Sequence, residues 1–191
     1  MQTAGLACAA VLGALLVVAA VSDIRTRRIP NALVAAGMLT GVAVQWLTPD
    51  GSGLFAFWWG GLGPASALFG LLAGLALFMP LHLLRVVGAG DVKLLAMVGT
   101  WLGPQALLGA TLATLVAGGL MALSIMAAKR SARTVLGNVR LMLTTAMLGL
   151  QAGTPQAFDR TLASGIRMPY AVAIALGTLT QVAWLLAHAS P

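Results

Sequence analysis

The sequence predicts an all-α, polytopic membrane protein with about six transmembrane helices. Of its 191 residues, 60% are hydrophobic and only 8% are charged. Apolar runs of about 17 or more residues, long enough for a helix to cross a bilayer, recur along the chain. The alternation of polar and apolar residues that is typical of a transmembrane β-barrel is absent. We therefore expect a single membrane-embedded domain over residues 1–191, with no second large globular domain.

Six apolar segments are the expected helices. The fourth is too short to cross a hydrocarbon core of ~30 Å unaided, because a helix rises only about 1.5 Å per residue. Gly103 and Pro104 nevertheless separate it from the fifth, since the uninterrupted run would be too long for one span. The segment 141–150 is also too short to span, and we expect an interfacial or re-entrant helix there. The expected limits of the six helices are 4–22, 31–48, 57–84, 92–102, 105–127 and 169–189.

The ends of the first helices carry recognisable signals. The first apolar run ends in VSDIRTRRIPN, where charged residues follow it directly. Pro30 suits the first turn of the second helix, and Asn31 is a candidate cap or hydrogen-bonding residue. Glycines and Pro64 interrupt the start of the third apolar segment, so we expect its first residues to be only loosely helical.

All 11 basic residues fall in loops that six crossings would place on one side of the membrane. The opposite loops, near 49–56 and 103–104, contain none. The positive-inside rule makes the basic side cytoplasmic and puts both termini on the other side. We attribute the net charge of +7 to membrane orientation and contact with anionic lipid, and we expect no binding of nucleic acid.

Four aspartates are the only acidic residues, and two of them are expected on the same side. Asp23 follows the first apolar run, and Asp91 opens the fourth helix in GAGDVK. Each has an ordinary structural explanation, since Asp23 can pair with nearby arginines and Asp91 can complement its helix dipole. Together they favour function, because carboxylates that meet across membrane helices relay protons, bind ions or perform acid–base chemistry. Asp50 and Asp159 are expected in exposed loops.

Other residues refine the kind of chemistry. Gly88 and Gly90 precede Asp91, and small residues permit unusual backbone angles and the close approach of an extended peptide. Lys93 does not share the helix face of Asp91, and we expect it to extend toward the membrane interface. The absence of glutamate excludes an HExxH zinc protease, and the single Cys8 excludes a disulfide or CxxC zinc site within the chain. We expect no metal and no cofactor.

Three segments in order resemble the type IV prepilin peptidases, which are GxGD aspartic proteases of bacterial membranes. Asp23 followed by RRIPN resembles the D…R-x-I-P-N segment of that family, and GAGDVKLLAMVG at 88–99 resembles its GxGDxKL signature. IRMPYAVAIALG at 166–177 is similar to the later proline motif that begins the last helix. The resemblance implies six helices and a catalytic pair at the cytoplasmic membrane surface, Asp23 and Asp91. The residues that it implies in substrate binding or site shaping are Gly88, Gly90, Lys93, Pro30, Asn31 and Pro169.

The resemblance also implies a substrate and a location. Family members remove the basic leader peptide from prepilins or pseudopilins at the bacterial inner membrane, without a cofactor. The chain starts directly with its first span and lacks the N-terminal cysteine-containing region of larger members that also N-methylate the product. It therefore resembles the small, peptidase-only members of tight-adherence (Flp) pilus systems. Two alternatives stay open at this point, a proton-coupled transporter that uses the same aspartates and a non-enzymatic membrane scaffold.

Overall fold

The structure is a computed structural model that describes residues 2–47, 63–84, 87–128, 137, 144 and 169–188. Its secondary-structure elements are all helices, so the all-α fold class is confirmed. The helices are α1 (Gln2–Thr26), α2 (Asn31–Leu47), α3 (Pro64–Leu83), α4 (Ala89–Ala128) and α6 (Tyr170–His188). Asp50, Asp159 and the segment 141–150, apart from Thr144, lie outside the described residues.

Four of the helices, α1, α3, α4 and α6, are long and apolar enough to cross a membrane. α2 is apolar but has only 17 residues, which is short for a membrane span. α4 is counted here as one span, although it is broken at Gly103. The number of about six transmembrane helices is therefore not confirmed, and it stays a prediction.

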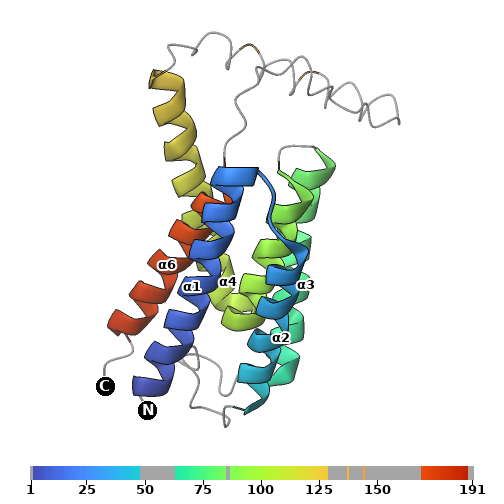
Figure 1. The fold of residues 1–191 in the computed structure, drawn as a ribbon, viewed down its shortest axis with the longest axis vertical. Helices are drawn as coiled ribbons and strands as arrows, with labels where there is room; N and C mark the ends of the chain where they lie inside the picture. The colour runs from blue at the N-terminus through green and yellow to red at the C-terminus, as the bar shows by residue number, and fades with distance from the viewer. Residues whose placement is uncertain are drawn as a thin grey trace.

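α4 consists of two helices joined at a sharp turn. Gly103 has φ 71° and ψ 173°, a conformation that is strained for a residue with a Cβ, and Pro104 cannot donate a backbone hydrogen bond. In Figure 1, the first half of α4 (green) runs down beside α3, and the second half (olive to yellow) runs back up toward the upper left. The break that the sequence predicts at Gly103 and Pro104 is confirmed.

Small residues let the helices approach α4 closely. Gly70 of α3 and Gly99 of α4 face each other so tightly that a Cβ on either would overlap the carbonyl oxygen of the other. In the same way, Gly177 of α6 lies against Thr114 in the second half of α4. Close backbone contact at small residues is a common basis of helix association in membranes, where lipid removes the hydrophobic drive between helices.

One end of the bundle collects the helix ends that carry the predicted site. The last turn of α1 and the starts of α4 and α6 lie in the upper part of Figure 1, and the chain descends from α1 to the start of α2; the first turn of α1 lies at the lower end. α1 continues past the expected limit at residue 22, and α4 begins before residue 92. Consequently Asp23 lies in the last turns of α1 and Asp91 in the first turn of α4.

Candidate active site

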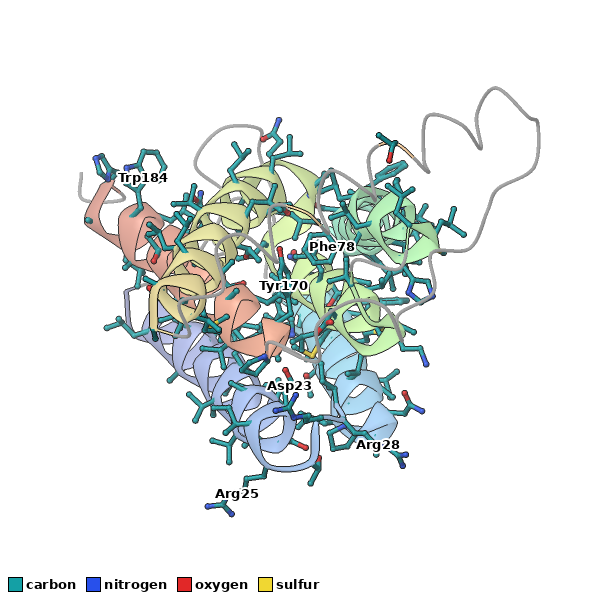
Figure 2. All side chains as sticks on the ribbon, turned by 90° about the horizontal axis from the view of Figure 1, so that it is seen from above. Asp23, Arg25, Arg28, Phe78, Tyr170 and Trp184 are labelled. Atoms are coloured by element: carbon teal, nitrogen blue, oxygen red, sulfur yellow. The ribbon has the colours of Figure 1, made fainter. Side chains whose placement is uncertain are left out.

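Asp23 joins the end of α1 to the start of α6. Its carboxylate is half-buried, and Oδ2 accepts a hydrogen bond of 3.2 Å from the backbone N–H of Ala171. The first N–H groups of a helix have no partner within the helix, so the carboxylate satisfies one of them and meets the positive end of the α6 dipole. Figure 2 shows Asp23 on the inner side of α1, while Arg25 and Arg28 lie at the outer edge of the bundle.

The chain directly after Asp23 forms a defined turn. Arg27 adopts a left-handed conformation with φ 54°, and its N–H bonds to the Asp23 carbonyl at 2.9 Å. Two hydroxyl groups then bond to the carbonyl of Arg28, from Ser22 at 2.9 Å and from Thr26 at 3.2 Å. The left-handed backbone conformation is energetically unfavourable for a residue other than glycine, and these two hydrogen bonds help to stabilise it at Arg27. The turn therefore fixes the direction in which the chain leaves α1.

Asp91 caps the helix in which it lies. Its half-buried carboxylate accepts a hydrogen bond of 3.0 Å at Oδ2 from the N–H of Gly88. In return, the Gly88 carbonyl accepts the N–H of Asp91 at 3.1 Å and that of Val92 at 3.3 Å. This reciprocal arrangement resembles a capping box with an acidic residue in the first turn. Asp91 thus has the structural role at its helix start that the sequence allows, and the hydrogen bond from Gly88 also fixes the orientation of the carboxylate.

The connection between α1 and α2 lies against the start of α4. The Lys93 ammonium group is exposed and donates a hydrogen bond of 3.1 Å to Oδ1 of Asn31, the first residue of α2. Pro30 directly precedes that helix, as its position in the sequence predicts. The side chain of Ile29 lies beside Gly90, at an ordinary van der Waals distance of 3.5 Å from where a Cβ would be. These contacts bring the segments of Asp23 and Asp91 to the same end of the bundle.

The two glycines that precede Asp91 have ordinary backbone conformations. α4 already begins at Ala89, so Gly90 is helical, and Gly103 is the only described glycine with a positive φ. Gly88 and Gly90 therefore do not use the positive φ that glycine permits, because a helix start needs only conformations open to any residue. The constraint at Gly88 is steric, because a Cβ at this position would lie only 3.1 Å from Asp91 Oδ2.

Tyr170 is a site residue that the sequence reasoning did not select. It follows Pro169, opens α6 and is half-buried. Its ring packs edge-to-face against Phe78 of α3 with centroids 5.9 Å apart. Figure 2 shows Tyr170 in the interior of the bundle, with Asp23 and Phe78 on either side. An aromatic residue directly after a proline, at the start of an apolar helix, is the signal that could have identified it.

The structure thus gathers the predicted site residues at one end of the bundle and orients both carboxylates with backbone N–H groups. Carboxylates held in this way can exchange protons with a substrate or with water. Within the described part of the chain, no group of three or more His, Cys, Asp or Glu side chains comes together as a metal site would require.

Comparison with known proteins agrees with this geometry. Residues 10–123 match the model of the type IV leader peptidase family, and this segment contains both Asp23 and Asp91. Neither a curated protein nor a solved structure matches the sequence. The matched segment covers more than half of the 191 residues and carries the two aspartates that the fold brings to one end. The chain therefore belongs to the type IV leader peptidase family, a family of proteases.

Proposed function

We propose that the protein is a membrane aspartic endopeptidase that removes the basic leader peptide from prepilins or pseudopilins, with Asp23 and Asp91 as its catalytic pair. The observation that supports it most is the convergence of the ends of α1, α4 and α6. It places the two aspartates of the family-like motifs at one end of the bundle, each with a backbone N–H donor.

Peptide hydrolysis needs a base and an acid, and two neighbouring carboxylates can supply both. In the proposed reaction the two carboxylates meet around the scissile bond, where like charges do not ionise together easily and one proton is shared between them. The ionised member removes a proton from water as the water oxygen attacks the scissile carbonyl carbon. The protonated member donates a hydrogen bond to the developing oxyanion, and the C–N bond then breaks as the leaving nitrogen takes up a proton. Every atom of this reaction comes from water, the peptide and the two side chains.

The setting of the pair favours a substrate at the membrane surface. Both aspartates lie at a helix end, and exposed cations lie beside them in the chain: Arg25 and Arg28 at the end of α1, and Lys93 near the start of α4. Cations near helix ends favour the cytoplasmic side, which supports the cytoplasmic face of the bacterial inner membrane as the location of the proposed site. A pilin whose apolar helix stays in the bilayer would present the junction with its basic leader at this level. The likeness to small, peptidase-only members favours a pilin of the tight-adherence (Flp) type.

A proton-coupled transporter built on the same two aspartates would need access from both membrane faces. The pair lies at one end of the bundle, and membership in a peptidase family gives this alternative no support.

The proposal is tested with purified protein in lipid and a candidate Flp-type prepilin, with the cleavage point read by mass spectrometry. Asp23→Asn and Asp91→Asn should each lower the cleavage rate by at least about 10²–10⁴-fold, the usual contribution of general acid–base catalysis. Asparagine keeps the size of the side chain and a carbonyl oxygen that can accept the Ala171 or Gly88 N–H, so the helix ends should stay intact. The double variant should be little worse than either single one, because the pair acts as a unit.

Asp50→Asn and Asp159→Asn are the matched controls and should cleave at the wild-type rate. A correctly folded Asp91→Asn protein that cleaves as fast as wild type would contradict the proposal and leave helix capping as the role of Asp91.

A further inference from the structure

Tyr170 packs directly beside the N–H group that supports Asp23, although its own side chain is no part of the proposed acid–base chemistry. It opens α6 one residue before Ala171, whose N–H bonds to Asp23. Its ring lies among residues of α3 and α4, the helix that carries Asp91. Tyr170 therefore connects three helices at the end of the bundle where the site lies.

The ring is held on two sides. Phe78 is fully buried and meets it edge-to-face, with an angle of 62° between the ring planes. Gly118, in the second half of α4, leaves so little room that a Cβ there would lie 3.2 Å from Cε2 and 3.3 Å from Oη. Aromatic rings have few rotatable bonds, so a ring packed in this way holds its backbone as well as its side chain.

The backbone that the ring holds is the first turn of α6. The Pro169 carbonyl accepts the N–H of Val172 at 3.2 Å, which leaves the intervening Ala171 N–H to point at Asp23. A rotation of this turn would move that N–H away from the carboxylate. Misplacement of a catalytic group by about 1 Å can cost about 10²-fold in rate.

We propose that Tyr170 is a positioning residue of the active site. By packing between Phe78 and Gly118, it fixes the first turn of α6 and thereby the N–H with which Ala171 orients the Asp23 carboxylate. This inference rests on the proposed role of Asp23 and Asp91 in peptide hydrolysis.

The test uses the whole chain in lipid with the same prepilin, and it separates the contribution of the Tyr170 ring from that of its hydroxyl group. Tyr170→Ala should lower kcat by about 10²-fold with KM nearly unchanged, because orientation of the Asp23 carboxylate is lost while the substrate contacts stay. Tyr170→Phe keeps the ring and should retain most of the activity. Ala171→Pro removes the N–H in the first turn of α6; because Ala171 is fully buried, its thermal unfolding is measured first, and the folded variant should reproduce the loss. The double variant Tyr170→Ala/Ala171→Pro should be no worse than either single one.

Trp184→Ala provides the matched control, since Trp184 is an aromatic residue of the same helix that is 54% exposed and stacks on His188 at the far end. It should leave kcat unchanged. If Tyr170→Ala fails to fold, as judged by thermal unfolding in detergent, Gly118→Ala replaces it, because the added methyl group displaces the ring and should also lower kcat.

Three results would overturn the inference: a wild-type kcat in folded Tyr170→Ala, a raised KM with unchanged kcat, or losses that add in the double variant. An error in the proposed function would give a different result, because Asp23→Asn or Asp91→Asn would then still cleave the prepilin at the wild-type rate.

Discussion

The two halves of α4 are both strongly apolar but have opposite surroundings. In the first half, every residue from Leu94 to Gly103 is buried, and this half lies against glycines of α2 and α3. The second half packs against α6 on one face and leaves a stripe of large apolar side chains exposed on the other. The exposed stripe consists of Leu108, Leu112, Leu115, Val116, Leu120 and Leu123.

The difference shows how a short helix can belong to a membrane protein. From Ala89 to Leu102 the helix rises only about 21 Å, less than a hydrocarbon core of ~30 Å. Protein rather than lipid surrounds residues 94–103, so the break at Gly103 can lie at membrane depth without exposing polar backbone to lipid. Asp91, at the start of this half, instead receives its hydrogen bond locally, from the Gly88 N–H.

The largest expected effect comes from adding one methyl group to each half. Gly99→Ala places a Cβ onto the Gly70 carbonyl, so the α3 and α4 backbones must separate, and we expect a loss of more than about 4 kcal/mol or no folded protein. Gly119→Ala in the second half meets nothing within 4 Å and should leave stability unchanged or slightly raised. Thermal unfolding in detergent measures both, and equal melting temperatures would refute the enclosure of the first half.

An intermediate effect is expected when a leucine is truncated in each half. Leu102 is 1% exposed, and Leu102→Ala should cost about 2–5 kcal/mol because the surrounding helices cannot fully close the cavity. Leu120 is 60% exposed, so Leu120→Ala should change stability by less than about 0.5 kcal/mol. Unfolding in a denaturing detergent compares the two variants, and a larger loss at Leu120 would reverse the assignment of the lipid-facing half.

The smallest effect on stability is expected at the start of the first half, where function should respond instead. A Cβ at Gly90 would contact Ile29 at an ordinary distance, so Gly90→Ala should leave the melting temperature unchanged. If an extended substrate lies against this turn, as we propose, the added methyl group should lower cleavage of the prepilin. Ala89→Ser, at a neighbouring exposed position, is the control for a small change in side-chain size. Wild-type cleavage by Gly90→Ala would argue against substrate contact here.

Much of the molecule follows from local sequence signals. Hydropathy determined the helical membrane class, since apolar runs of that length have few other stable forms. Gly103 followed by Pro104 determined the break in α4, because one residue permits the turn and the other cannot continue the hydrogen-bond ladder. The motifs around Asp23 and Asp91 likewise sufficed to indicate the peptidase family.

Only the tertiary structure decided which apolar surfaces meet and which donors reach the aspartates. The two halves of α4 are similarly apolar, so hydropathy alone could not tell the enclosed half from the half that faces lipid. The bond from Ala171 to Asp23 joins residues 148 positions apart, and the bond from Lys93 to Asn31 joins residues 62 apart. Such contacts depend on close backbone approach at residues such as Gly70 and on helix directions set by the whole bundle. No local pattern specifies them, which is why the packing of Tyr170 between Phe78 and Gly118 emerged only from the packed structure.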